Sequence, residues 1–419
     1  MDRFVIEGPT RLEGEVRVGG AKNAVLPLMA AALLARGESL IGNVPDLRDV
    51  RTFMRLLEML GARCELAGDA LRIDTSAADG VEAPYELVKT MRASVYVLGP
   101  LLAARGQARV SLPGGCAWGP RPVNLHLDGL RALGAELDLD GGYIVGRAPA
   151  GLRGGRFRFE PSSVGATANV LMAAVLADGT SELLNCACEP EVTLLAEALT
   201  GAGARIEGIG TTTLVVRGVS ALAPLRHQVI PDRIEAGTFM AAAAVTGGRI
   251  TLTHCRPDHL DACTAVLRAM GCAVTPAGAG VLTVEAGERP RAVEVVTRPY
   301  PGFPTDMQAQ VMMVATLAFG TSFVTDTIYP DRFTHVAELR RLGADIRLDG
   351  ASAIVFGVDR LQGAPVMATD LRASAALILA GVAAHGTTTV DRIYHIDRGY
   401  ERIEQKLAAL GARIRRVAG

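Results

Sequence analysis

The chain has 419 residues, with 43 Lys and Arg against 44 Asp and Glu, and a formal net charge of −1. This balance excludes a general binder of polyanions, because nucleic acids and anionic membranes attract proteins with a clear surplus of basic residues. Hydrophobic residues make up 49% of the chain, which excludes a disordered protein. The length suggests about two or three domains.

The N-terminal segment MDRFVIEG has no basic stretch followed by an apolar run, so we expect no signal peptide. The longest charge-free stretch, residues 307–325, carries glutamine, glycine and hydroxyl side chains, whereas a membrane-spanning helix needs about 20 mostly apolar residues. The 7 cysteines lack a CxxC pair, which argues against a disulfide framework and a zinc ribbon. We expect a cytoplasmic soluble protein with no nucleic-acid partner and no membrane insertion.

One unit of about 70 residues recurs along the whole chain. A helix-ending LGA-like signature recurs with its glycine at Gly61, Gly134, Gly203, Gly271, Gly343 and Gly411. A second series of turn glycines follows Ala-rich apolar helices, at Gly37, Gly106, Gly179, Gly248, Gly320 and Gly386. Two landmarks with one period indicate six homologous units, which divide naturally into two domains of three.

Each unit reads as helix, turn, strand, loop, second helix, strand, turn and strand. The first helices, such as VLPLMAAALLA, TFMAAAAV and SAALILAGVAA, are apolar on nearly all sides, which predicts that they are buried. The strands ELDLD at 136–140 and DIRLD at 345–349 alternate instead, which predicts that Leu137, Leu139, Ile346 and Leu348 face the core. The pattern predicts an α/β fold in which sheets lie outside a helical core.

Polar residues mark the start of several of these buried helices. Counting back fourteen residues from each turn glycine leads to Asn23, Arg92, Gly165, Ile234, Asp306 and Arg372. Helix N-termini offer unpaired N–H groups and partial positive charge, which suit phosphate or carboxylate ligands. Asn and Asp there can be ordinary caps. Arginine opposes the helix dipole unless an anion lies nearby, so the arginines favour an anion site.

A second set of cations follows the first strand of four units, at Arg48, Arg121, Arg332 and Arg398. In the second unit this loop reads PGGCAWGPRP, and its glycines predict a hinged segment able to close over a ligand. Cys116 lies in that loop near Arg121, and a neighbouring cation can make a thiol reactive by lowering its pKa. The alternative interpretation is an inert buried cysteine.

Two other motifs carry less weight. The histidines and cysteines of HCRPDHLDAC at 254–263 match no common zinc spacing, so we predict no metal site. The segment GGAKNA lacks the spacing of a Walker A loop, so nucleotide hydrolysis is not supported. We therefore expect no cofactor.

Eight long strings carry a family resemblance: GGAKNAVLPLMAA, VKTMRASVYVLGP, SLPGGCAWGPRPVNLHLDGL, SSVGAT, IPDRIEAGTF, FPTDMQAQ, MATDLRASAAL and DRIYHIDRGYERI. They resemble the enolpyruvyl transferases that use UDP-N-acetylglucosamine, from Phe4 to the end of the chain. The resemblance implies a two-domain inside-out α/β barrel with three βαβαββ units per domain. Residues 22–230 would form the first domain and residues 1–21 plus 231–419 the second, with the substrate cleft between them.

The implied reaction transfers the enolpyruvyl group of phosphoenolpyruvate to the 3′-hydroxyl of UDP-N-acetylglucosamine, with release of phosphate through a tetrahedral intermediate. It is the first committed step of peptidoglycan synthesis. By resemblance, the catalytic residues are Cys116, Asp306, Lys22 and Arg398. Asp306 would be the general base, and Cys116 would form an adduct with phosphoenolpyruvate and act in general-acid chemistry or product release. The fosfomycin epoxide would alkylate this cysteine.

The resemblance also assigns the substrate contacts. Phosphoenolpyruvate would be held by cations, namely Lys22, Arg92, Arg121, Arg332, Arg372 and Arg398. UDP-N-acetylglucosamine would be held by Asn23, Arg92, Arg121, Pro122, Val123, Asn124, Leu125, Ser163, Val164, Gly165, Asp306 and Ile328. Asn124 and Pro161 depart from the family pattern, which commonly has Asp and often Lys there, so nucleotide contacts could differ in detail.

Two alternatives remain open at this point. One is an enolpyruvyl transferase acting on shikimate 3-phosphate, which shares the fold and the donor. The loop PGGCAWGPRP and the string SSVGAT favour the nucleotide sugar instead. The other is a non-catalytic scaffold of six packed units, which would not need Lys22, Asp306 and several arginines at equivalent positions.

Overall fold

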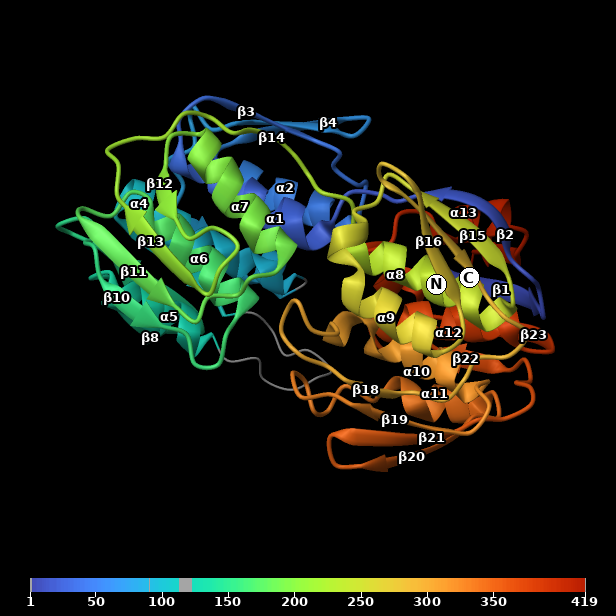
Figure 1. The fold of residues 1–419 in the computed structure, drawn as a ribbon. Coiled ribbons are helices and arrows are strands. Elements are labelled where there is room, and N and C mark those ends of the chain that lie inside the picture. The colour runs from blue at the N-terminus through green and yellow to red at the C-terminus, as the bar shows by residue number, and fades with distance from the viewer. Residues whose placement is uncertain (1, 90, 113–122, 419) are drawn as a thin grey trace. The chain divides into compact units, whose positions relative to one another are not determined.

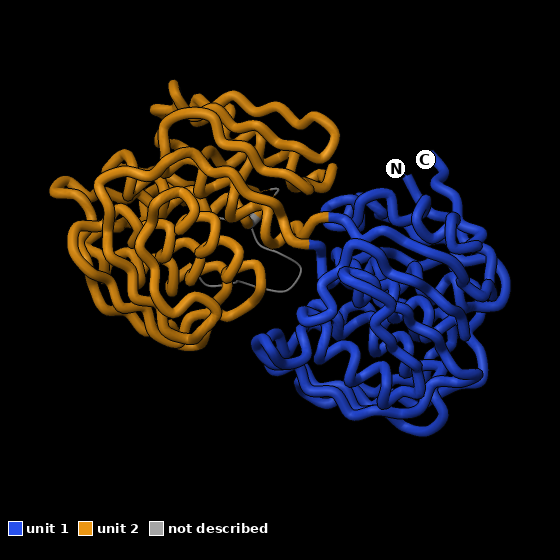
Figure 2. Tube along the Cα trace, turned by 45° about the horizontal axis from the view of Figure 1, so that its top comes forward, with its two compact units in different colours: residues 1–19, 231–419 blue, residues 20–230 orange. Residues whose placement is uncertain are grey.

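The computed structural model describes residues 2–89, 91–112 and 123–418 (Figure 1). The chain forms two compact units, which Figure 2 colours separately. Unit 1 comprises residues 1–19 and 231–419, and unit 2 comprises residues 20–230. The chain therefore passes between the units at residues 19–20 and again at residues 230–231.

Unit 1 contains strands β1 (Arg3–Gly8), β2 (Glu13–Arg17), β15 (Arg249–Thr253), β16 (Ala273–Gly278), β17 (Val281–Glu285), β18 (Glu294–Val296), β19 (Thr321–Thr325), β20 (Asp345–Asp349), β21 (Ser352–Phe356), β22 (Pro365–Met367), β23 (Gly386–Asp391) and β24 (Arg413–Val417). Its α-helices are α8 (Arg233–Thr246), α9 (Asp261–Ala269), α10 (Gln308–Thr316), α11 (His335–Arg341), α12 (Leu371–Ala383) and α13 (Ile403–Ala409). Short 3-10 helices are η3 (Pro257–His259), η4 (Thr305–Met307) and η5 (Ile393–Arg398).

Unit 2 contains strands β3 (Glu38–Gly42), β4 (Arg63–Ala67), β5 (Ala70–Asp74), β6 (Glu82–Ala83), β7 (Gln107–Ser111), β8 (Glu136–Asp140), β9 (Tyr143–Arg147), β10 (Arg156–Arg158), β11 (Thr180–Leu184), β12 (Arg205–Glu207), β13 (Thr213–Arg217) and β14 (Arg226–Gln228). Its α-helices are α1 (Lys22–Ala31), α2 (Arg48–Met59), α3 (Tyr85–Val88), α4 (Leu98–Arg105), α5 (Asn124–Ala132), α6 (Val164–Ala174) and α7 (Pro190–Gly201). The 3-10 helices are η1 (Ala32–Leu34) and η2 (Arg92–Val97).

The strands form six four-stranded mixed sheets, three in each unit. The orders in unit 1 are β22-β23-β1-β24, β16-β17-β15-β2 and β18-β19-β21-β20. In unit 2 they are β14-β3-β5-β4, β6-β7-β9-β8 and β10-β11-β13-β12. Strand β1 pairs antiparallel with β23 and β24, and β2 pairs parallel with β15, so the N-terminal segment completes two sheets of unit 1.

The apolar helices lie inside the sheets, as the sequence predicts. In unit 1, α8, α10 and α12 pack against one another, and almost every residue of each is buried. In unit 2, α6 contacts both α1 and α4. Their alanine and glycine content allows close helix packing, because interaxial distance depends on the side chains at the contact. The expected fold, with buried helices and sheets outside, is confirmed.

The glycine periodicity also has a conformational basis. All six glycines of the LGA series have positive φ, between 87° and 108°, where glycine meets no Cβ clash. Five glycines of the second series also have positive φ. In the fourth unit the left-handed residue is Gly247, one residue before the expected Gly248, and it caps the C-terminus of α8.

The expected burial of two strand leucines is wrong. Leu137 and Ile346 are buried, but Leu139 is 61% exposed and Leu348 is 46% exposed. Leu139 belongs to β8 and Leu348 to β20. Each strand lies at the edge of its sheet, and each leucine is close to the turn of its hairpin. Alternation selects the face of the sheet, but it does not determine how far the helical layer extends beneath that face.

The N-terminal segment is tied to unit 1 by a buried carboxylate. Glu235 of α8, which is 4% exposed, accepts the backbone N–H of Gly19 at 2.6 Å and the Nζ of Lys406 at 2.7 Å. Burial raises the pKa of Glu235, and the attraction of Lys406 opposes that rise.

Among the described residues, no helix is long and apolar enough to cross a membrane.

Candidate active site

The helix starts counted from the sequence are confirmed as helix starts. Asn23, Gly165, Ile234, Asp306 and Arg372 are each the second residue of a helix, and Arg92 is the first residue of η2. The first turns of α6, α8 and α12 are capped by Ser163, Asp232 and Asp370, whose side chains accept backbone N–H groups. The three caps lie just outside these helices, and the predicted residues Gly165, Ile234 and Arg372 each follow a cap by two positions.

In unit 1, Asp306 forms ion pairs with two arginines from distant segments of the chain. Its Oδ1 lies 2.8 Å from Nη1 of Arg332, and its Oδ2 lies 2.9 Å from Nη2 of Arg372. The arginine side chains are 8% and 5% exposed, while the Asp306 side chain is 25% exposed. Two guanidinium groups against one carboxylate leave this cluster with a net positive charge, which suits an anionic ligand.

The electrostatics of the cluster keep Asp306 ionised. Burial favours the neutral acid, but the attraction of Arg372 and Arg332, with a hydrogen bond from each, outweighs it. The pKa of Asp306 therefore lies well below its usual range. Burial also acts against the charge of Arg372, and Asp306 overcomes it and raises the pKa of Arg372. At neutral pH the cluster presents a carboxylate that can accept a proton and two permanently charged guanidinium groups.

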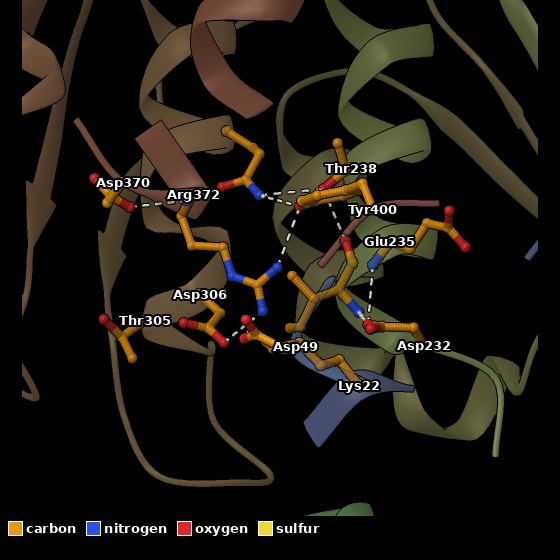
Figure 3. Close-up of polar contacts among 12 residues, drawn as sticks. Lys22, Asp49, Asp232, Glu235, Thr238, Thr305, Asp306, Asp370, Arg372 and Tyr400 are labelled. Carbon is orange, nitrogen blue, oxygen red and sulfur yellow. Dashed lines mark hydrogen bonds and ion pairs between the residues drawn. The ribbon is translucent and has the colours of Figure 1, made fainter. Parts of the chain in front are cut away.

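A buried polar network supports Arg372 from behind (Figure 3). The Tyr400 hydroxyl lies 3.4 Å from Nη1 of Arg372 and 2.8 Å from the hydroxyl of Thr238. Gln310 Nε2 donates to Tyr400 at 3.2 Å and to Thr238 at 3.1 Å. Because these partners are at most 2% exposed, their hydrogen bonds restrict the guanidinium to few orientations.

His335, three residues after Arg332, is uncharged at neutral pH. His335 is 1% exposed and begins α11. Its burial, together with repulsion from Arg332, lowers the pKa of His335 to about 3. A neutral imidazole neither adds to the positive charge of the cluster nor attracts Asp306 away from its arginines.

In unit 2, Lys22 is paired with a residue that the sequence analysis missed. Its Nζ lies 2.9 Å from Oδ2 of Asp49, and the two side chains are 12% and 5% exposed. Lys22 is the first residue of α1, and Asp49 lies in the first turn of α2. In the sequence, Asp49 is marked only by its neighbour Arg48, one of the four arginines that follow the first strand of a unit.

The predicted nucleotide contacts of unit 2 lie on two adjacent helix starts. Val123 is the N-cap of α5, which begins with Asn124 and Leu125, and Ser163 is the N-cap of α6, which begins with Val164 and Gly165. The two helices pack together. A Cβ added at Gly165 would lie 3.3 Å from the imidazole of His126, so the first turns of the two helices approach closely. Asn124 is exposed and Asn23, in α1, is half-buried.

For the remaining predicted residues, the structure gives the element on which each one lies. Arg398 ends η5, a helix that packs against α12, and is half-buried. Ile328 lies between β19 and α11, and its amide donates to Asp326 at 3.0 Å. Arg92 begins η2, which packs against α1 and α6. Cys116, Arg121 and Pro122 lie outside the described residues.

The arrangement of helices and sheets is shared with solved enolpyruvyl transferases. The crystal structure of the enolpyruvyl transferase NikO from Streptomyces tendae is 27% identical, with a TM-score of 0.90, and the match covers 100% of this chain and 99% of that one. EPSP synthase from Acinetobacter baumannii, at 18% identity and a TM-score of 0.75 over 100% of both chains, shares the fold. The fold class is therefore that of the enolpyruvyl transferases.

The sequence comparison identifies the family directly. The sequence model for EPSP synthase (3-phosphoshikimate 1-carboxyvinyltransferase) matches residues 6–407, and the chain belongs to this family of transferases. A protein of Anaeromyxobacter sp. (strain Fw109-5), named UDP-N-acetylglucosamine 1-carboxyvinyltransferase, is 58% identical over 99% of both chains. Proteins of the same name from Trichlorobacter lovleyi and Geobacter metallireducens are 56% and 54% identical over 100% of both chains.

Proposed function

We propose that the protein transfers the enolpyruvyl group of phosphoenolpyruvate to the 3′-hydroxyl of UDP-N-acetylglucosamine and releases phosphate. The observation that carries this proposal is the identity of 54–58%, over essentially the whole chain, to proteins named for that reaction. The reaction would take place in the cytoplasm as the first committed step of peptidoglycan synthesis. No cofactor enters the proposal.

The alternative acceptor, shikimate 3-phosphate, shares the fold and the donor. The family model that matches residues 6–407 is named for that reaction. Identity to the solved EPSP synthase of Acinetobacter baumannii is 18%, far below the identity to the nucleotide-sugar relatives. We therefore propose the nucleotide sugar as the acceptor.

The proposed chemistry is an addition followed by an elimination. In the addition, the 3′ oxygen bonds to C2 of phosphoenolpyruvate, the hydroxyl proton passes to a base, and C3 gains a proton. In the elimination, C3 loses a proton and the bond from C2 to the phosphate oxygen breaks, which restores the double bond and releases phosphate. The protein has to accept one proton, deliver another and stabilise the anionic groups.

We assign the base role to Asp306. Its carboxylate is ionised at neutral pH and its side chain is 25% exposed, so it is able to accept a proton, although its low pKa makes it a weak base that depends on close contact with the hydroxyl. Arg332 and Arg372 would orient it and leave a positive charge for the carboxylate or phosphate of phosphoenolpyruvate. Lys22 and Arg398 would contact the phosphate. Since Lys22 is paired with Asp49, phosphate would have to share or replace that contact.

The remaining assignments involve residues of unit 2, with Ile328 of unit 1. We propose that the adjacent starts of α5 and α6 bind the uridine diphosphate, because the first N–H groups of a helix lack partners within the helix and suit anionic oxygens. Arg92, Arg121 and Pro122 would complete the contacts of the substrates, and Cys116 would form the adduct with phosphoenolpyruvate. Asn23 and Ile328 would contact the amino sugar and its nucleotide.

A phosphate-release assay tests the proposal. Purified protein is mixed with phosphoenolpyruvate and either UDP-N-acetylglucosamine or shikimate 3-phosphate, and inorganic phosphate is measured over time. We expect release with the nucleotide sugar alone. Release with shikimate 3-phosphate would replace the acceptor, and no release with either acceptor would refute the enzymatic proposal.

A further inference from the structure

A buried aspartate, Asp326, is connected to the Asp306 cluster by two successive hydrogen bonds through Thr305. Asp326 follows β19 and is 0% exposed. Its Oδ2 accepts the hydroxyl of Thr305 at 2.7 Å, and its Oδ1 accepts the hydroxyl of Thr297 at 2.9 Å. Oδ1 also accepts the backbone amides of Ile328 at 3.0 Å and Tyr329 at 2.8 Å. One carboxylate thus binds two threonine hydroxyls and the beginning of the segment that leads to Arg332.

The Thr305 hydroxyl connects Asp326 to Arg332. A hydroxyl has one proton, and that proton is donated to Asp326, so the oxygen can only accept from other neighbours. Nη1 of Arg332 donates to it at 3.0 Å. The same nitrogen lies 2.8 Å from Oδ1 of Asp306. The two N–H bonds of Nη1 are therefore both directed, one toward Thr305 and the other toward Asp306, and this sets the plane of the guanidinium.

We propose that Asp326 is a positioning residue for the transfer reaction, which acts through Thr305 to hold Arg332 against Asp306. Asp326 does not contact substrate. It orients the hydroxyl of Thr305, and through the amides of Ile328 and Tyr329 it holds the chain that carries Arg332. This inference rests on the proposed function, because it assumes that the geometry of Asp306 and Arg332 matters for turnover.

The competing explanation is that Asp326 only stabilises the fold. The two threonines separate these explanations, because each donates one hydroxyl to Asp326 from a different side. Besides Asp326, the Thr297 hydroxyl binds the backbone amide of Thr327 at 3.0 Å, so its contacts end in the main chain. The Thr305 hydroxyl continues to Arg332. Loss of either hydroxyl removes a hydrogen bond to the buried carboxylate of Asp326, but only loss of the Thr305 hydroxyl releases the arginine.

The experiment compares two isosteric variants, Thr305→Val and Thr297→Val. This pair is preferred to Asp326→Ala, which would leave four donors without their acceptor, all of them buried or partly buried, and would threaten folding. We expect similar decreases in the midpoint of thermal unfolding for both. For Thr305→Val, kcat should fall at least about tenfold with little change in the KM for UDP-N-acetylglucosamine, because small displacements of reacting groups are costly. Thr297→Val should keep a kcat close to that of the wild type.

Thr305→Ser provides the rescue test, because serine retains the hydroxyl and loses only a methyl group. It should recover most of the kcat lost in Thr305→Val. Equal kcat values for the two valine variants would overturn the inference, and so would a Thr305→Ser variant as slow as Thr305→Val.

A readout that needs no turnover separates this inference from the proposed function. The guanidinium signals of Arg332 in ¹⁵N NMR spectra can be assigned by their loss in Arg332→Lys. They should shift in Thr305→Val and stay in place in Thr297→Val, and the reverse pattern would overturn the inference. If the wild-type protein releases no phosphate, the proposed function fails, while these spectra still decide whether Asp326 and Thr305 orient Arg332.

Discussion

Replacing Asp306 by asparagine removes the negative charge between two buried guanidinium groups and keeps the size of the side chain. If Asp306 accepts the 3′-hydroxyl proton, kcat should fall at least about a hundredfold, which is the lower end of general-base effects and corresponds to about 2.7 kcal/mol in the barrier. The same change leaves Arg332 and Arg372, with side chains 8% and 5% exposed, without their counter-charge. Breaking a buried pair costs about 3 kcal/mol or more, which lowers the midpoint of thermal unfolding by roughly 10 °C in a unit of this size.

The assay has to separate the chemical effect from the stability effect. Phosphate release is measured well below the unfolding midpoint of Asp306→Asn, with circular dichroism as a check of folding. Asp258→Asn is the matched control, because it makes the same chemical change in an exposed ion pair with Arg256 and should leave kcat and stability nearly unchanged. Inorganic phosphate should raise the unfolding midpoint of Asp306→Asn more than that of the wild type, because an anion can replace the lost carboxylate. A near-normal kcat for folded Asp306→Asn would remove Asp306 from the base role.

The depressed pKa of Asp306 means that its ion pairs stabilise the fold above about pH 4 and are lost only as the pH falls further, so urea unfolding between pH 5 and 8 should show no titration from this group. Lys406→Met should destabilise unit 1 by about 3 kcal/mol near pH 8. The loss should shrink as the pH falls, because burial raises the pKa of Glu235 and removal of Lys406 takes away the charge that opposes this rise. An equal loss at every pH in thermal unfolding would contradict this. Fosfomycin should alkylate Cys116 and leave the half-buried Cys64 and the buried Cys186, Cys263 and Cys272 unmodified at neutral pH, as peptide mass spectrometry can show. Burial raises the pKa of Cys64, Cys186 and Cys263 to about 12 and of Cys272 to about 11.

Several features of the fold could be predicted from local patterns. The turn glycines, the apolar helices and the helix starts each depend on residues within one or two turns of one another. Glycine tolerates the left-handed conformation after a helix, and a helix that is apolar on all sides has to be buried. For this reason the positions counted back from the turn glycines fall on the first or second residue of each helix.

The partners of the predicted charges could not be read in the same way. Asp49 is 27 residues from Lys22, and Arg372 is 66 residues from Asp306. Tyr400 supports Arg372 together with Thr238, which lies 162 residues earlier in the chain. In the sequence, Thr305 is only the residue before Asp306, and Asp326 is only the residue after a strand. The local pattern does not indicate a role for either. Their role depends on the packing of η4 and the segment after β19 against each other.

The local sequence thus determines which residues are charged and where each helix begins, because turn conformation and hydrophobic periodicity act over a few residues. Which carboxylate meets which cation, and which leucines of the edge strands remain exposed, depends on how the sheets are placed around the buried helices. Long-range packing brings Asp306, Arg332 and Arg372 to within hydrogen-bond distance, and burial then strengthens their electrostatic interaction. The net charge of −1 for the whole chain does not reveal this local concentration of positive charge.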